Sequence, residues 1–151
     1  MGREKLSSKL KISGGFFPIP HQVSNSLKYR GLSAKAVKLL VDIGSQFNGR
    51  NNGDFTAAWK IMQPRGWKSE ETLHSAKKEL LTAGFIAETR KGRRPNLCSL
   101  YGITWIKINP SPKFDIKPYA FPYGAWEHSA PEIQTEKSNA LTTTTVFKIS
   151  A

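Results

Sequence analysis

Apolar side chains recur at helical spacing between residues 34 and 47, and this is the clearest pattern along the chain. Positions three, four and seven residues apart fall on one face of an α-helix. Ser33 comes directly before this stretch, and its hydroxyl can accept a hydrogen bond from a free N–H of the first turn. We therefore predict an amphipathic helix capped by Ser33. Its apolar face consists of Ala36, Leu39, Leu40, Ile43 and Phe47.

Two Asn-Gly pairs, at residues 48–49 and 52–53, interrupt the pattern after this helix. Such pairs favour turns that need positive φ, so we expect a structured connection here rather than a ligand loop. A shorter helix is predicted over about 56–63, and it ends at Pro64, Arg65 and Gly66. Its inward side chains are expected to be Ala58, Ile61 and Met62.

A second amphipathic helix is predicted directly after Ser69. Ser69 is a suitable N-cap, and Glu70 and Glu71 suit the positive end of the helix dipole. Gly84 lies where a glycine commonly ends a helix. The buried stripe is predicted to be Leu73, Ala76, Leu80 and Leu81. Two helices joined by a tight turn form a helix-turn-helix.

Two β-prone segments follow, over residues 85–90 and 97–105. The second alternates, and alternation places successive side chains on opposite faces of a strand. One face is predicted to carry Leu97, Tyr101, Ile103 and Trp105, and the other Cys98, Gly102 and Thr104. A hairpin placed directly after a helix-turn-helix is a wing. The predicted fold class is therefore α+β, a winged helix-turn-helix with three to four helices and a β-hairpin, over residues 16–108.

The chain outside these residues has a different character. Residues 1–15 are predicted to form a basic N-terminal arm, followed by an apolar anchor at 16–19 and a short helix over about 21–28. Residues 109–151 are rich in proline and then in threonine and serine, which is typical of an extended tail. We expect the core to lie upstream of this tail, so that a chain truncated after Ile108 stays folded.

The tail nevertheless concentrates aromatic residues in the stretch YAFPYGAW, residues 119–126. Disordered linkers are usually poor in aromatic residues, so the stretch needs a structural explanation. Either it packs back on the domain, or it forms a docking strip for a protein partner or a second copy of the chain. The side chains of such a strip would be Tyr119, Phe121, Tyr123 and Trp126.

Composition excludes several classes of protein. The chain has 151 residues, 38% of them hydrophobic, and no run of about 18 apolar residues that could cross a membrane. No apolar stretch near the start is typical of a secretory signal, so we expect a cytoplasmic location. Cys98 is the single cysteine, which leaves no intrachain disulfide and no cysteine metal cluster.

Candidate catalytic residues are scarce. The sequence holds no glycine-rich phosphate loop, no HExxH motif and no GxSxG motif. His21, His74 and His128 are far apart, and each fits a surface or packing role better than a ligand role. Cys98 fits a small core residue better than a nucleophile. We therefore expect no enzymatic activity, no cofactor and no metal.

Positive charge changes the picture most. The formal net charge is +12 at pH 7, and the sequence pI is ≈ 10.0. Residues 1–106 hold 18 Lys and Arg against 7 Asp and Glu, whereas the remaining residues hold 5 against 4. A strongly basic domain is explained either by a polyanionic partner or by a solvated basic surface that keeps the protein in solution.

The chain contains the stretches GLSAKAVKLL, NGRNNGDFTAAW, RGWKSEETLHSAKKELLTAGFIAETRKG and LYGITW. Together, over residues 16–108, they resemble small bacterial winged helix-turn-helix proteins. Relatives of this kind are often carried by phages, plasmids and integrated mobile elements, where they act in transcription regulation or DNA replication. The resemblance implies double-stranded DNA as the partner. Some winged helices bind proteins, so the alternative is a module that docks onto a protein or ribonucleoprotein assembly through its tail.

Residues near the start of a recognition helix usually meet base edges, whereas cations beside it meet phosphates. The base-contacting candidates are Lys68, Glu71, Thr72 and Ser75. The phosphate-contacting candidates are Lys77, Lys78, Arg90, Lys91, Arg93 and Arg94, together with Arg3 and Lys5 of the arm.

Two further points stay open at this stage. Glu70 and Glu71 are either a first-turn charge pattern, or Glu71 accepts a hydrogen bond from the N4 amine of cytosine. Trp59 and Trp67 flank the predicted turn, and they either pack in the core or stack on bases.

Overall fold

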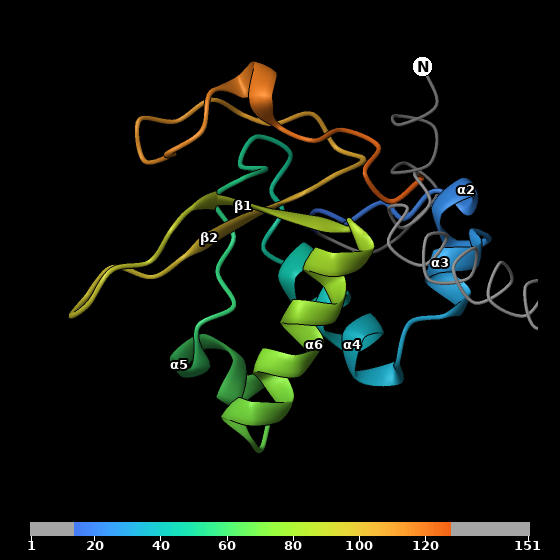
Figure 1. Cartoon of the computed structure of the whole chain (residues 1–151), viewed down its shortest axis with the longest axis horizontal. Helices are drawn as coiled ribbons and strands as arrows, with labels where there is room; N and C mark the ends of the chain where they lie inside the picture. Colours follow the sequence, from blue (N-terminus) through green and yellow to red (C-terminus); the bar gives the residue numbers. More distant parts are fainter. Residues whose placement is uncertain (1–13, 128–151) are drawn as a thin grey trace, which may run out of the picture.

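The computed structural model describes residues 14–127, and Figure 1 shows them as a mixed α+β fold. Within this part of the chain there are five α-helices and one two-stranded antiparallel sheet. The elements are α2 (His21–Ser24), α3 (Leu27–Arg30), α4 (Ala34–Gly44), α5 (Trp59–Met62), α6 (Glu70–Ala83), β1 (Ile86–Arg90) and β2 (Leu100–Ile103), with 3-10 turns η1 (Gln63–Arg65) and η2 (Pro118–Ala120). The α+β class predicted from the sequence is confirmed, but these residues form five helices rather than the predicted three to four, because the helix expected over 21–28 is two short helices.

Helix α4 forms as the apolar pattern predicts. The Ser33 hydroxyl accepts a hydrogen bond from the Ala36 amide at 3.1 Å, so the predicted cap is confirmed. All five residues of the predicted apolar face are buried, although the helix ends at Gly44 and Phe47 lies just beyond it. Burial of one Leu or Ile side chain stabilises a fold by about 1.5–3 kcal/mol, so this face is a major source of stability.

Helix α6 also begins and ends where predicted. The Ser69 hydroxyl accepts a hydrogen bond from the Thr72 amide at 3.3 Å, and Gly84 ends the helix at φ +81°. The Glu79 carboxylate accepts hydrogen bonds from the Ser33 N–H and hydroxyl, both at 2.7 Å, and so ties α6 to the start of α4. The predicted stripe consists of buried Leu73, Ala76 and Leu80 and half-buried Leu81.

Helix α5 is shorter than the helix predicted over 56–63. Residues 55–58 are extended, because the Gln46 side chain hydrogen-bonds the backbone carbonyl and amide of Thr56 at 2.9 and 3.0 Å. The helix is therefore a single turn that continues into η1. Met62 is buried as predicted, but Ile61 is 46% exposed, because one turn presents only a narrow inward side.

The short helix predicted over 21–28 is instead two four-residue helices, α2 and α3. Helix α3 begins after Ser26, whose hydroxyl accepts a hydrogen bond from the Tyr29 amide at 3.2 Å. Val23 is buried in the core, whereas Leu27 is 83% exposed.

The turns predicted at the two Asn-Gly pairs are confirmed, because Gly49 and Gly53 have φ values of +96° and +108°. Asn52 between them is fully buried. Its side-chain amide donates to the carbonyls of Ile103 and Ile106 at 3.0 and 2.7 Å, and its oxygen accepts from the Ile103 amide at 2.8 Å. A buried amide is costly unless bonded, so these contacts fix the loop against the end of β2.

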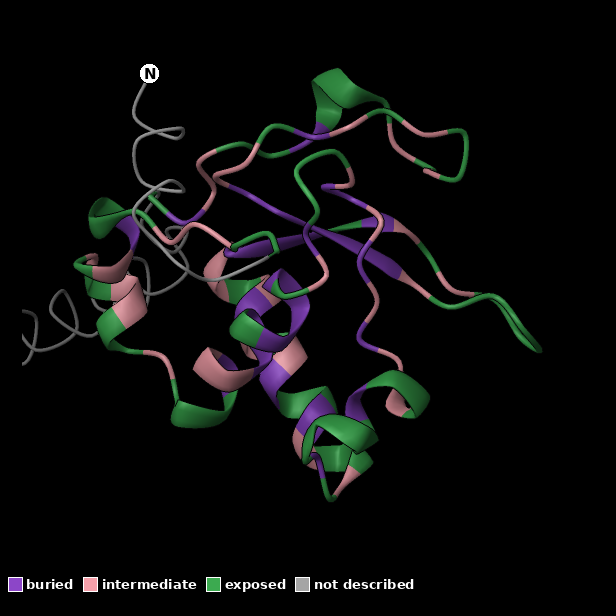
Figure 2. Cartoon of the chain, turned by 180° about the vertical axis from the view of Figure 1, so that it is seen from behind, coloured by how far each residue is buried: buried purple, intermediate pink, exposed green. Residues whose placement is uncertain are grey.

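The hairpin of β1 and β2 is covered on both faces, as the buried base of the strands in Figure 2 shows. Tyr101 and Ile103 belong to the main core with the helices, and Phe55 adds an antiparallel bridge to Tyr101. Gly102 points to the opposite face, where a side chain at this position would come within 3.0 Å of the Phe121 ring. All four residues of β2 are therefore buried, and neither face is free.

The alternation predicted over 97–105 holds within β2 but not before it. Leu97 is 42% exposed and Cys98 is exposed, in the arm of the hairpin beyond the sheet. The expectation that Cys98 is a core residue is therefore wrong, because the covering segment ends at the base of the hairpin.

Residues 109–127 pack back onto the domain, which was one of the two alternatives for the tail. Trp126 is 6% exposed and belongs to the main core. The Ala125 backbone passes so close to Gly84 that a side chain there would meet the Ala125 carbonyl oxygen at 2.5 Å. A small cluster on the outer face of the hairpin consists of Ala87, Ile108 and Phe121. The core extends past Ile108, which revises the expectation that truncation at this point leaves the fold intact.

Candidate nucleic-acid interface

The start of α6 carries the four base-contacting candidates. Lys68, Glu71 and Ser75 are exposed, whereas Thr72 is half-buried and its amide is bonded to the Ser69 cap. These residues occupy the loop before α6 and its first two turns. The exposed side of this end of the helix is therefore polar, with hydrogen-bond donors and acceptors within a short span.

Lys77 and Lys78 follow on α6 and face different surroundings. Lys77 Nζ lies 5.9 Å from the centroid of the Tyr101 ring, so Lys77 faces β2, whereas Lys78 is exposed. Glu79, two residues after Lys77, faces Ser33 at the start of α4. Because residues two positions apart on an α-helix are separated by about 200° around its axis, the hairpin and the start of α4 flank α6 on nearly opposite sides.

The tip of the hairpin projects from the body of the fold, and its surface is exposed (Figures 1 and 2). Arg93 and Leu97 close the tip through two backbone hydrogen bonds of 2.8 and 2.9 Å. Lys91, Arg93 and Arg94 are exposed, and none forms a salt bridge with another residue between 14 and 127. Three cations are thus concentrated on a narrow protruding element, where mutual repulsion is the cost of keeping them together.

Arg90 differs from the other three cations of the hairpin. Its Nε and Nη2 atoms donate to the Cys98 carbonyl at 3.1 and 2.8 Å, across the hairpin from Arg90. The Arg90 guanidinium therefore links the two arms of the hairpin at the end of the sheet that lies nearer the tip. Arg90 has a structural contact in addition to any role toward a partner, so it is unsuitable as a simple probe of phosphate contacts.

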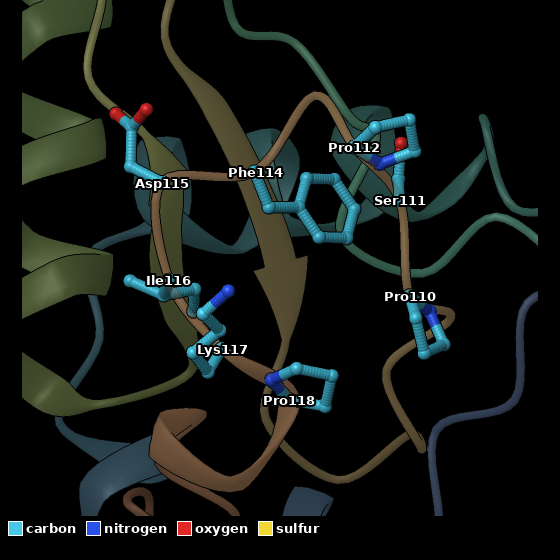
Figure 3. A pocket seen from close by; sticks show the side chains of 8 residues that line it. All are labelled: Pro110, Ser111, Pro112, Phe114, Asp115, Ile116, Lys117 and Pro118. Carbon is cyan, nitrogen blue, oxygen red and sulfur yellow. The ribbon is translucent and has the colours of Figure 1, made fainter.

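A loop formed by residues 109–118 supports the base of the hairpin. The Asp115 carboxylate accepts a hydrogen bond from the Lys91 amide at 2.8 Å, and the Asp115 amide donates to the Thr89 carbonyl at 2.8 Å. This loop encloses a hollow of ≈ 380 Å³, lined mainly by proline and apolar side chains. Figure 3 shows these side chains around Phe114. Since the Asp115 carboxylate is already bonded to the hairpin, we assign the loop a supporting role.

A buried carboxylate that the sequence analysis missed holds the segment before α6. Asp42 of α4 is 5% exposed and accepts three hydrogen bonds. The donors are Lys38 Nζ at 2.7 Å, Trp67 Nε1 at 2.8 Å and Arg65 Nε at 3.0 Å. Trp67 is 3% exposed, so its ring packs in the core, as one of the two alternatives for this residue proposed. The sequence clue was an acidic residue three positions after Leu39, in phase with the apolar face.

The three donors also control the charge of Asp42. Burial raises the pKa of its carboxyl, but the hydrogen bonds from Lys38, Trp67 and Arg65 outweigh this effect, so the pKa lies below the ordinary value. The Asp42 carboxyl is therefore ionised in the folded protein at neutral pH. It connects α4 to η1 and to the residue two positions before the Ser69 cap, which fixes the start of α6.

Asp42→Asn is expected to lower the free energy of unfolding at pH 7 by roughly 1–3 kcal/mol, because buried donors lose a charged acceptor. A carboxyl whose pKa is lowered by folding stabilises the fold above its unfolded pKa, about 3.9 for Asp, and loses this contribution as the pH falls further. Urea unfolding from about pH 7 down to about pH 2 should therefore show a shrinking difference between the two proteins.

The control for this prediction is Asp54→Asn, which breaks a more exposed ion pair with Lys113. Exposed pairs contribute about 0–1 kcal/mol, so this variant should unfold almost like the parent. A difference between Asp42→Asn and the parent that stays constant down to about pH 2 would show that ionised Asp42 has no role in stability.

The four aromatic residues proposed as a docking strip separate into two groups. Phe121 and Trp126 are 4% and 6% exposed and pack inside the fold, so they are not free to dock. Tyr119 is 89% exposed, and Tyr123 is 46% exposed with its hydroxyl accepting a hydrogen bond from the Ile108 amide. Arg3 and Lys5, the candidates from the arm, lie outside the described residues.

Between residues 14 and 127, no three His, Cys, Asp or Glu side chains come together in a way that could hold a metal ion. Over the same residues, no helix has the length and apolar character needed to cross a bilayer.

We compared the chain with known proteins at the level of family, sequence and structure. No protein-family model, no curated protein and no solved structure matches it. We therefore infer the function from the residues and from the geometry of the fold.

Proposed function

We propose that this chain is a double-stranded DNA-binding protein with winged helix-turn-helix architecture, in which α6 enters the major groove and the hairpin lies along the phosphate backbone. The observation that carries the proposal is the group of three exposed cations, Lys91, Arg93 and Arg94, on a hairpin that directly follows α6. Duplex DNA carries roughly one negative charge per 1.7 Å of helix axis, so a protruding cationic tip has a matching partner in it.

Dimensions support this arrangement. A helix with its side chains is about 10–12 Å across, and the major groove is about 12 Å wide. Helix α6 has 14 residues and keeps its N-terminal end free of the core, because the buried stripe starts only at Leu73. Lys68, Glu71, Thr72 and Ser75 would then meet base edges, while Lys77 and Lys78 would meet phosphates.

Glu70 and Glu71 are the exposed carboxylates in this surface. Both lie in the first turn of α6, where an acidic side chain interacts favourably with the helix dipole by about 0.3–1 kcal/mol. We assign Glu70 this role. Glu71 is exposed one residue further along and remains a candidate acceptor for the cytosine N4 amine.

A role in regulation or replication of a mobile element belongs to the same proposal and follows from the resemblance of residues 16–108. A docking module that uses the aromatic strip has weaker support. Phe121 and Trp126 pack inside the domain, so only Tyr119 and Tyr123 of the strip are exposed for docking. The basic arm with Arg3 and Lys5 would add phosphate contacts that are independent of sequence.

Ser75→Ala and Lys68→Ala are expected to change which sequences the protein prefers, because each base contact contributes about 1–3 kcal/mol of discrimination. A site selected from a random library by the parent protein should lose about tenfold or more of its advantage over random duplex, since 1.4 kcal/mol is tenfold. The control is Lys117→Ala, which removes an exposed cation from the loop on the outer face of the hairpin. If both helix variants select the parental site with undiminished preference, α6 is not the helix that contacts the bases.

A further inference from the structure

Arg65 has a combination of contacts that the DNA-binding proposal does not use. Its Nε atom donates to the Asp42 carboxylate at 3.0 Å, while its side chain remains 41% exposed. Neither Nη nitrogen hydrogen-bonds another residue within 14–127. The guanidinium is thus fixed at one edge by a buried carboxylate, and its two Nη groups, with four N–H donors, are left for another acceptor.

Other cations gather around the same point. Lys38 Nζ donates to Asp42 at 2.7 Å and to the Arg65 carbonyl at 2.9 Å. Lys35 and Lys38 also lie over the Trp67 ring, with Nζ atoms 5.8 and 5.5 Å from its centroid. Two of these cations, Lys38 and Arg65, bond the single carboxylate of Asp42, and Lys35 lies beside them, so the group keeps an excess of positive charge.

The position of these three cations relative to α6 indicates what they can bind. Arg65 ends η1 and lies five residues before Glu70, the first residue of α6, on the side of α4. The hairpin contacts the nearly opposite side of α6, through Lys77 and Tyr101. A helix in the major groove has one phosphate ridge on each side, because the groove is only slightly wider than the helix.

We propose that Arg65, positioned by Asp42, binds a DNA phosphate on the flank of α6 opposite the hairpin, with Lys35 as the second cation of the site. This inference depends on the proposed function. Arginine suits the role because its planar guanidinium forms two parallel hydrogen bonds to a phosphate. Asp42 is a positioning residue here, since it orients the guanidinium before DNA arrives and so reduces the entropy lost on binding.

The test uses the full chain and a random-sequence duplex of about 20 base pairs, with affinity measured at several salt concentrations. Arg65→Ala should weaken binding about tenfold, and it should flatten the slope of log K against log salt by about one unit. Arg65→Lys should keep the slope but bind severalfold more weakly, because lysine retains the charge without the Nε contact or the planar fork. The matched control is Arg50→Ala, an exposed arginine of the loop at residues 48–54.

Ethylation of single phosphates, in a duplex that carries the site selected by the parent protein from a random library, locates the contact. Ethylation of one particular phosphate should weaken binding of the parent protein but not of Arg65→Ala. This phosphate should lie across the major groove from the phosphates whose ethylation ceases to matter when the hairpin cations are changed. Combining Arg65→Ala with Asp42→Asn should cost no further affinity than Arg65→Ala alone. Should Asp42→Asn fail to fold, the two Arg65 variants and the ethylation pattern still decide the matter.

This inference alone is overturned if the parent protein binds duplex and Arg65→Ala matches Arg50→Ala in affinity, slope and ethylation pattern. Parent protein that fails to bind duplex at low salt would overturn the proposed function, and the inference with it.

Discussion

Truncation after Ile108 is expected to unfold the protein, whereas truncation after Glu127 is expected to leave its cooperative thermal unfolding intact. The shorter form lacks Phe121 and Trp126, which are 4% and 6% exposed in the fold. Loss of a buried Phe or Trp side chain costs about 3–5 kcal/mol, and a whole domain is stable by only about 5–15 kcal/mol. The longer form keeps every described contact. Circular dichroism during heating measures both.

Single substitutions give the same test without removing chain. Phe121→Ala and Trp126→Ala should each lower the free energy of unfolding by about 3–5 kcal/mol. Tyr119→Ala, in the same segment but 89% exposed, is the matched control and should stay within about 0.5 kcal/mol of the parent. A protein truncated after Ile108 that melts cooperatively at the parental temperature would show that residues 109–127 are dispensable for the core.

The combined change of Lys91, Arg93 and Arg94 to Ala is expected to weaken binding to every duplex by roughly 100-fold at low salt. This figure takes about 1 kcal/mol for each lost charge pair at the surface. The slope of log K against log salt should flatten by about 3 units, close to one per lost phosphate contact. Arg90 stays unchanged in this variant, because it bonds the Cys98 carbonyl and its loss would also disturb the hairpin.

A charge-matched control separates contact from net charge. Changing Arg50, Lys107 and Lys117 to Ala also removes three exposed cations, from segments outside the hairpin tip and α6. This control should keep a slope near that of the parent, with a modest loss of affinity from the lower net charge. If the hairpin variant and the control have the same slope and affinity, the hairpin does not contact DNA.

Local rules in the sequence were sufficient for the two longer helices. Ser33 and Ser69 cap α4 and α6, and the predicted apolar positions are buried except for half-buried Leu81, because these helices are long enough for a 3.6-residue period to define one face. Gly84 ends α6 in the left-handed conformation that glycine tolerates best. In both helices the local signals, namely the caps and the apolar spacing, thus agree with the position of the helix in the fold.

Contacts between distant segments explain what the sequence could not predict. Gly102 was predicted on the strand face opposite Tyr101, but no local pattern indicates that Phe121, 19 positions further along the chain, covers this face. Thr56 appeared helical, but the Gln46 side chain holds it extended. Tail composition was compatible with both packing and docking, and the burial of Phe121 and Trp126 and the close approach of Ala125 to Gly84 distinguish them.

The candidate site could be predicted only in part, because some of its contacts also join distant segments of the chain. Exposed cations such as Arg93 and Arg94 can be recognised from charge density alone, and they are exposed in the structure. Arg65 was interpreted only as a residue that ends a helix. Its contact with Asp42 joins positions 23 residues apart, and no local pattern indicates such a pair.

The most direct test of the DNA-binding proposal is the affinity of the full chain for a random-sequence duplex of about 20 base pairs, measured by fluorescence anisotropy over a range of salt concentrations. We expect binding at low salt that weakens steeply, with log K falling linearly against log salt and a slope of about −4 or steeper, since at least four phosphate contacts are proposed. Absence of binding at low salt, or affinity that does not respond to salt, would contradict the proposal that this protein binds DNA through α6 and the cationic hairpin.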